Sequence, residues 1–141
     1  MRSEVVCKEN RIQYKLKNSQ KHEIAKIKVD GGVFPPVASK THEHKKCDFL
    51  LVNCDQLFGI LVELKGTDCS TAIKQITDTL DLIKNTLIQH QLMQVHARVA
   101  MRSTKHVDKV SNERMKLDRK LKTGFGGGSL KIAKSPFIDS M

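Results

Sequence analysis

The apolar residues of this chain are concentrated in two runs near its middle. Residues 48–53 and 57–65 are almost continuously apolar and rich in Leu, Val and Ile, and residues 53–56 join them as a short polar turn. Runs of this length and composition are typical of strands that are covered on both faces. We therefore predict a hairpin of two buried strands at the centre of the fold.

A helix is predicted directly after this hairpin. Gly66 ends the second strand, and Asp68 or Ser70 can cap the helix that follows. From about residue 69 to residue 92 the apolar side chains recur at helical spacing, which makes this helix the clearest element of the pattern. The remaining predicted elements are a strand over 94–103 with Val95, Ala97, Val99 and Met101 on one face, a charged helix over 107–122, a turn at 124–128 and a short strand over 129–138.

The pattern before the hairpin leaves more than one structure open. Residues 1–22 are polar and rich in Lys, but segment 11–17 alternates with period two, so a short helix and an irregular strand pair both fit. Residues 24–30 predict a strand that ends at a Gly-Gly break, and residues 33–46, with two prolines, predict a loop. The order of elements predicts an α/β fold in one domain, with its sheet covered by helices.

The charge of the chain points to a class of partner. The sequence has 25 Lys and Arg residues against 15 Asp and Glu, which gives a formal charge of +10. An excess of this size favours nucleic acid as a partner, because phosphate contacts release counterions. A basic surface without a specific partner is the alternative. Five Phe, one Tyr and no Trp are too few aromatic side chains for a platform on which bases stack.

Neither a membrane nor a secreted setting is indicated. No apolar run approaches the length of a bilayer span, and the first ten residues lack the apolar centre of a signal peptide. We therefore expect a cytoplasmic protein without a membrane partner. In that compartment Cys7, Cys47, Cys54 and Cys69 are expected to be buried thiols rather than two disulfides.

Two charged residues interrupt the second apolar strand, in the segment FGILVELKG. Since alternate residues of a strand share a face, Glu63 and Lys65 point the same way. Asp48 opens the neighbouring strand, and an ordinary hairpin register brings it alongside them. Two carboxylates this close repel each other unless a cation lies between them, and Mg²⁺ prefers oxygen ligands. A lysine beside a metal-bound water completes a site suited to phosphodiester hydrolysis.

Asp48, followed after fourteen residues by Glu63-Leu64-Lys65, resembles the signature of the PD-(D/E)XK, or restriction-endonuclease-like, nuclease superfamily. The resemblance covers about residues 24–101 and includes the helix predicted after the Glu-x-Lys strand. It implies a small mixed central sheet flanked by helices. It also implies cleavage of nucleic acid, DNA more than RNA, that depends on Mg²⁺ or Mn²⁺.

The resemblance also implies roles for individual residues. Carried over by position, Asp48 and Glu63 would be metal ligands, and the backbone carbonyl of Leu64 would be a further ligand. Lys65 would be the catalytic lysine. Gln75 lies where several branches of the superfamily place a helical Gln, and it would belong to the catalytic site.

The chain departs from the superfamily pattern in two places. The residue before Asp48 is Cys47 rather than Pro. An acidic residue on a first helix often belongs to the site. Here Glu4, Glu9 and Glu23 are all candidates, and Glu9 is favoured.

The expected function is that of a metal-dependent endonuclease. One such domain cuts one strand, so cutting a duplex would favour a homodimer. The main alternative is a catalytically inactive protein of the nuclease fold that binds nucleic acid or a protein partner. A third is an unrelated α/β domain in which Glu63 and Lys65 form a surface ion pair and Asp48 is a turn or cap residue.

A cluster of potential zinc ligands precedes and follows the first buried strand. His42, Glu43 and His44 lie before Cys47, and Cys54 lies beyond it. Structural zinc sites have tighter paired spacings, so we favour a polar loop with incidental histidines.

Two further segments carry weaker signals. Residues 124–128, GFGGG, lack the Lys-Ser/Thr of a phosphate loop, which favours a flexible connector. The charged helix is either a solvated surface or a contact for a nucleic-acid backbone. Its cations are Lys109, Arg114, Lys116, Arg119, Lys120 and Lys122, and Arg98, Arg102, Lys131 and Lys134 extend the same predicted surface.

Overall fold

The computed structural model describes residues 3–29, 47–105 and 107–141 of the chain. In chain order the elements are β1 (Glu4–Glu9), β2 (Ile12–Lys17), β3 (Ile24–Lys28), β4 (Phe49–Asn53), β5 (Phe58–Lys65), α1 (Cys69–Gln89), β6 (Gln94–Met101), the short 3-10 helix η1 (Val107–Val110), α2 (Ser111–Gly124), β7 (Leu130–Lys134) and β8 (Phe137–Ser140). None of the helices within these ranges combines the length and the apolar character needed to span a membrane.

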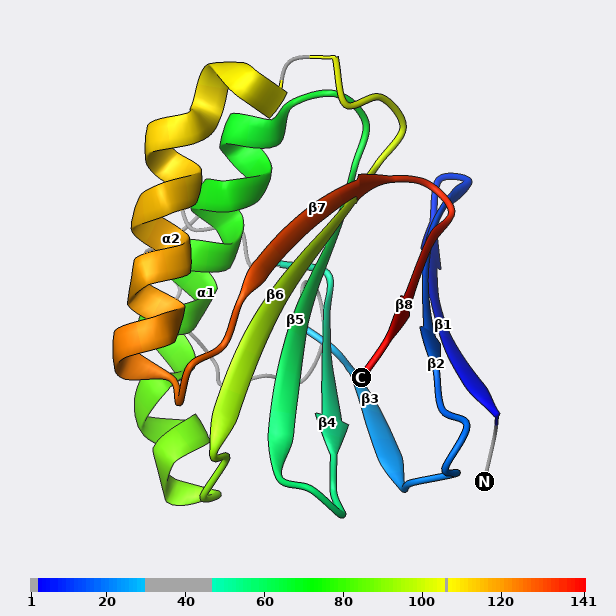
Figure 1. Ribbon diagram of the computed structural model, residues 1–141, viewed down its shortest axis with the longest axis vertical. Helices are drawn as coiled ribbons and strands as arrows, with labels where there is room; N and C mark the ends of the chain where they lie inside the picture. The colour runs from blue at the N-terminus through cyan, green and yellow to red at the C-terminus, as the bar shows by residue number, and fades with distance from the viewer. Residues whose placement is uncertain (1–2, 30–46, 106) are drawn as a thin grey trace.

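The elements form three layers (Figure 1). The middle layer is a five-stranded mixed sheet with the order β3-β4-β5-β6-β7. Helices α1 and α2 lie side by side on one face of this sheet, and a three-stranded mixed sheet, β1-β2-β8, lies on the other side. The protein therefore has a mixed α/β fold, as the order of predicted elements indicated.

The predicted hairpin, the helix after it and the strand that follows this helix are confirmed. Strands β4 and β5 are antiparallel, with Phe49 opposite Val62 and Asn53 opposite Phe58. Helix α1 follows and ends at Gln89, three residues earlier than expected. Strand β6 then pairs with β5 in parallel, so α1 is the crossover between two parallel strands.

The second sheet was not predicted. Of the two structures that fitted residues 1–22, the strand pair is the one observed, because β1 and β2 form an antiparallel hairpin. The predicted strand over 129–138 is wrong as one element, since β7 pairs with β6 while β8 pairs in parallel with β2. The expectation of a sheet flanked by helices is also corrected, because the helices lie on one face of the large sheet and the small sheet covers the other.

Strand β5 is buried on both faces, from Phe58 to Leu64. On the helix side Leu61 belongs to a cluster with apolar residues of α1, such as Ile76 and Leu80. On the opposite side Ile60, Val62 and Leu64 pack with Tyr14, Leu16 and Phe137 of the small sheet. The near-continuous apolar sequence of this strand is explained by these two separate cores.

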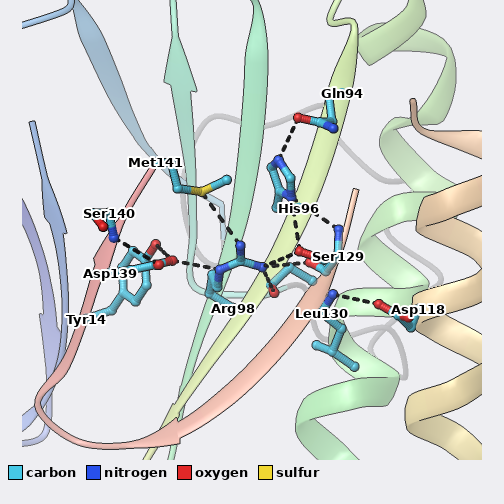
Figure 2. A network of polar contacts seen from close by, with 11 residues as sticks. Tyr14, Gln94, His96, Arg98, Asp118, Ser129, Leu130, Asp139, Ser140 and Met141 are labelled. Atoms are coloured by element: carbon cyan, nitrogen blue, oxygen red, sulfur yellow. Dashed lines mark hydrogen bonds and ion pairs between the residues drawn. The ribbon is translucent and has the colours of Figure 1, made fainter. Parts of the chain in front are cut away.

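A buried ion pair links the two sheets (Figure 2). Arg98 of β6 is 1% exposed, and its Nε lies 2.7 Å from Oδ2 of Asp139 in β8. The hydroxyl of Tyr14 in β2 donates to the same oxygen at 2.8 Å. Burial alone would raise the pKa of Asp139, but the hydrogen bonds from Arg98 and Tyr14 outweigh it and hold that pKa below its usual value. Arg98 is thus a buried cation, and the expectation that it belongs to a basic surface is wrong.

His96 lies beside this ion pair on the same strand. The backbone N–H of Ser129 donates to Nδ1 of His96 at 3.1 Å, so the ring proton is on Nε2, which lies 2.8 Å from Oε1 of Gln94. Burial lowers the pKa of His96 to about 4, and the charge of Arg98 adds to this effect. His96 is therefore a neutral structural residue at physiological pH.

The glycine-rich turn is packed rather than flexible. Gly126 has a positive φ of 68°, and a Cβ added to Gly126 or Gly128 would overlap the carbonyl oxygen of Met93 or Val95. The N–H of Val95 also donates to the carbonyl of Phe125 at 3.1 Å. These glycines let the chain pass close to the start of β6, so the expected flexible connector is corrected.

Replacing Gly128 tests this close approach. We expect Gly128→Ala to lower the free energy of unfolding by about 2 kcal/mol or more, because its Cβ overlaps the Val95 carbonyl. Gly124→Ala is the matched control, since nothing lies within 4 Å of its added Cβ, and it should be neutral or stabilise by up to about 1 kcal/mol. Urea unfolding of both variants measures this; equal stabilities would contradict it.

The lowered pKa of His96 predicts a pH dependence of stability. Below about pH 6.5 the unfolded chain takes up a proton on this residue that the folded chain does not. As the pH is lowered from about 6.5 to about 4, the free energy of unfolding should therefore decrease, by up to about 3 kcal/mol for this group. Urea unfolding across this range should show a smaller fall for His96→Gln than for the wild type. The exposed His90→Gln should behave like the wild type, and identical profiles for all three proteins would refute the assignment.

Candidate active site

The open end of the β4–β5 hairpin brings Asp48 to the Glu-x-Lys strand. Phe49 lies opposite Val62, and the same register continued by one residue places Asp48 across from Glu63. The backbone N–H of Leu64 donates to Oδ2 of Asp48 at 2.8 Å. This hydrogen bond holds the aspartate beside the end of β5, at the upper end of the sheet in Figure 1.

Both carboxylates are largely withdrawn from solvent. Asp48 is 9% exposed and Glu63 is 1% exposed. Leu61, two residues before Glu63, belongs to the helix-side cluster, so the alternation of the strand directs Glu63 toward the α1 layer. Burial of ionised carboxylates is unfavourable unless other groups or a cation compensate for it.

Lys65 is held by helix α1. Its Nζ donates to Oε1 of Gln75 at 2.7 Å, and the lysine side chain remains partly exposed. The helix starts only four residues later, where Asp68 accepts a hydrogen bond from the N–H of Thr71 and caps it. This short connection places the second turn of α1 directly beside the end of β5.

Thr79 is a site residue that the sequence did not reveal. Its hydroxyl oxygen accepts a hydrogen bond from the N–H of Cys47 at 2.8 Å and donates to the carbonyl of Gln75 at 2.7 Å. Thr79 is completely buried. One face of α1 thus holds both the residue before Asp48 and the side chain of Lys65. The available signal was a polar residue within the apolar stripe of the helix.

The donor set suits a hard cation. Asp48 and Glu63 supply carboxylate oxygens from neighbouring strands, and such oxygens are the ligands that Mg²⁺ prefers. Within residues 3–29, 47–105 and 107–141, no group of three or more His, Cys, Asp or Glu side chains is placed to hold a metal ion. Two carboxylates fit an ion that keeps several waters, as Mg²⁺ does, better than an ion enclosed by protein ligands.

The cysteines do not form a shared metal site. Cys47 and Cys54 lie at opposite ends of β4, too far apart to bind one zinc ion. The other zinc candidates, His42, Glu43 and His44, lie outside the described residues. All four cysteines are free thiols, but Cys54 is exposed, so the expectation that all four are buried is wrong for that residue.

The negative charge of Asp48 affects the pKa of a residue in the small sheet. The pKa of Cys7 in β1 is raised to about 12, chiefly by burial; the positive charge of Lys26 opposes this rise, and the negative charge of Asp48 contributes to it. Cys7 is therefore an un-ionised thiol without nucleophilic character at neutral pH.

The acidic candidates for a first helix are not on a helix. Within residues 3–29 the chain forms only strands and their connections. Glu4 starts β1 and its Oε2 lies 3.4 Å from Nζ of Lys17, while Glu9 ends the same strand. The N–H of Glu23 donates to Asp55 in the β4–β5 turn, at the end of the hairpin away from Asp48.

The cations of α2 are only partly available to a ligand. Lys120 forms an ion pair with Asp81 of α1, and Nζ of Lys122 lies 2.6 Å from Asp118. The hydrogen bond from Lys122 lowers the pKa of Asp118. The charge of this helix is therefore offset in part by neighbouring carboxylates.

Thr79 can be tested by two substitutions of similar size. Thr79→Val removes the acceptor of the buried Cys47 N–H, and we expect the free energy of unfolding to fall by about 1–3 kcal/mol. Hydrogen exchange at the Cys47 amide should also accelerate. Thr79→Ser keeps the hydroxyl and should retain the protection of that amide. Equal protection in the two variants would mean that the hydroxyl does not hold this segment.

No model of a known protein family matches the chain, and no curated protein or solved structure matches it. Its function is therefore inferred from its own residues and contacts.

Proposed function

We propose that this protein is a metal-dependent nuclease with a restriction-endonuclease-like core, which hydrolyses phosphodiester bonds in DNA or, less favourably, in RNA. One observation carries the proposal: Asp48, Glu63, Lys65 and Gln75 meet at the open end of one hairpin, joined by the Asp48–Leu64 and Lys65–Gln75 hydrogen bonds. The antiparallel strands β3, β4 and β5, followed by a helix and the parallel strand β6, also agree with the small mixed sheet that the resemblance implies.

The two carboxylates would hold the metal ion. Asp48 and Glu63, with the carbonyl of Leu64, are the residues that would bind Mg²⁺ or Mn²⁺. Such an ion lowers the pKa of a bound water and stabilises negative charge on a phosphate oxygen. The N–H of Leu64 orients the Asp48 carboxylate, so the aspartate needs little rearrangement to act as a ligand.

Lys65 would act on the attacking water. Its ammonium group can donate to that water, orient it and favour the loss of its proton. Gln75 accepts a hydrogen bond from the same ammonium group at 2.7 Å, which restricts the long lysine side chain to one region. Gln75 is therefore assigned a positioning role.

A second function is favoured by the burial of the site. Glu63 is only 1% exposed, whereas a residue that binds a metal at a phosphate must face the substrate. A protein of this fold that binds nucleic acid or a protein partner without cleavage would have no such requirement. The two functions make opposite predictions for the same experiment.

The test is incubation with Mg²⁺ or Mn²⁺ and a panel of linear, circular, branched and single-stranded DNA and RNA. We expect the wild type to cleave at least one substrate, and Lys65→Ala and Asp48→Asn to lower the rate by at least about 100-fold. Lys74→Ala, an exposed lysine beside Gln75 on α1, is the matched control and should cleave normally. Thermal unfolding of each variant separates loss of activity from loss of folding.

Two outcomes decide between the candidates. Substrates that remain intact with the wild type, but are bound by it, would reject catalysis and support the binding function. Cleavage that Asp48→Asn and Lys65→Ala leave unchanged would reject the assigned residues. With a circular duplex, the ratio of nicked to linear product tests whether two copies act together, since one site cuts one strand.

A further inference from the structure

Three cations gather at one edge of the large sheet. Strands β5, β6 and β7 are parallel, so their carboxyl ends meet at the same edge, at the top of Figure 1. Lys65 closes β5 and Lys134 closes β7, and both are register partners of Met101, the last residue of β6. Arg102 follows immediately. We call these three residues, Lys65, Arg102 and Lys134, the basic edge.

Backbone hydrogen bonds hold Arg102 beside the candidate site. Its N–H lies 3.0 Å from the carbonyl oxygens of both Lys65 and Gly66, and the N–H of Ser103 donates to Gly66 at 3.2 Å. The guanidinium lies close to the same loop, because a Cβ added to Gly66 would be 3.8 Å from Nη1 of Arg102. The positions of Lys65 and Arg102 are therefore coupled by the main chain.

The basic edge differs in its partners from four other cations of the chain. Arg98 is buried against Asp139, and Lys17, Lys120 and Lys122 are all paired with carboxylates. In the described part of the chain, no member of the basic edge forms an ion pair with a carboxylate, and Arg102 and Lys134 are exposed. Their charges are thus available to an anionic ligand.

We propose that the basic edge binds the phosphodiester backbone of a nucleic-acid strand that crosses β5, β6 and β7. The inference rests on the proposed nuclease function, which puts the phosphate to be cut at Lys65. Arg102 and Lys134 then bind phosphates on one side of it. Two strand spacings span about 10 Å, and one DNA strand carries a charge about every 3.4 Å along the helix axis, so the edge faces about three phosphates.

The path of the bound nucleic-acid strand follows from the positions of the strand ends at this edge of the sheet. Ligands of sheets with parallel strands bind outside the carboxyl ends of those strands, where loops and helix starts leave room. A backbone that runs across this edge passes Lys134, Arg102 and Lys65 in turn and reaches Asp48, which directly precedes β4. The remaining cations of α2 are not required for this path.

The test uses two exposed lysines of the same strand. Lys131 and Lys134 both lie on β7, but Lys131 is the register partner of Arg98 and lies three residues away from the edge. Binding of a short fluorescent DNA duplex is measured by anisotropy in EDTA, over a series of salt concentrations, for the wild type, Arg102→Gln, Lys134→Gln and Lys131→Gln. EDTA prevents cleavage, so binding is measured by itself.

We expect Arg102→Gln and Lys134→Gln each to reduce the slope of log affinity against log salt by about 0.9, the loss of one phosphate contact. Lys131→Gln should leave the slope unchanged. The proposal is overturned if Lys131→Gln has the same effect as Lys134→Gln, if no variant changes the slope, or if the wild type does not bind at low salt.

The same variants distinguish this proposal from the proposed function. Cleavage that is insensitive to Asp48→Asn, together with slopes that depend on Arg102 and Lys134, would reject the assigned active site and keep the binding edge. If cleavage requires Asp48 but the salt slopes are unchanged in Arg102→Gln and Lys134→Gln, the proposed nuclease function stands and binding at the basic edge is rejected.

Discussion

The burial of β5 on both faces is the constraint on which the arrangement depends. Helix α1 covers one face and the small sheet covers the other, so charged side chains are tolerated only where the strand ends. Glu63 and Lys65 occupy this end, and the neighbouring elements supply Asp48 and Gln75 there. A register shift of one residue would turn Glu63 into the apolar space between the two sheets. The packing that stabilises the fold therefore also determines the geometry of the candidate site.

The cations of the chain include both a buried arginine and residues at the surface. Arg98 stabilises the junction of the two sheets. Asp139 and the backbone carbonyls of Ala97 and Ser129 accept hydrogen bonds from its buried guanidinium, and Tyr14 donates to the same carboxylate. Breaking such a pair leaves an uncompensated buried charge, so the role of this arginine is structural. On the helices, Lys120 and Lys122 form ion pairs with Asp81 and Asp118. These paired cations are not available to a polyanion, although the net charge of the chain remains +10.

The features that could be predicted from the sequence are those that depend on the local pattern of residues. The β4–β5 hairpin, α1 and the meeting of Asp48 with Glu63 and Lys65 follow from periodicity, a short turn and the simplest register. The small sheet was missed because β2 pairs with β8, which lies more than a hundred residues away and shows no local sign of its partner. Thr79 was missed for a similar reason, since its partner Cys47 belongs to another element.

The parallel pairing of β2 with β8 affects the order in which the protein can fold. Tyr14 and Asp139 are 125 positions apart in the chain, so the small sheet is completed only after β8 has been made. Contacts of such long range close large loops and form slowly. Until they form, β1 and β2 alone cover the apolar face of β5 that contains Ile60, Val62 and Leu64, and Phe137 of β8 is absent from that cluster. During synthesis, the edge of β2 that later pairs with β8 is therefore an unpaired strand edge, to which another nascent chain could pair.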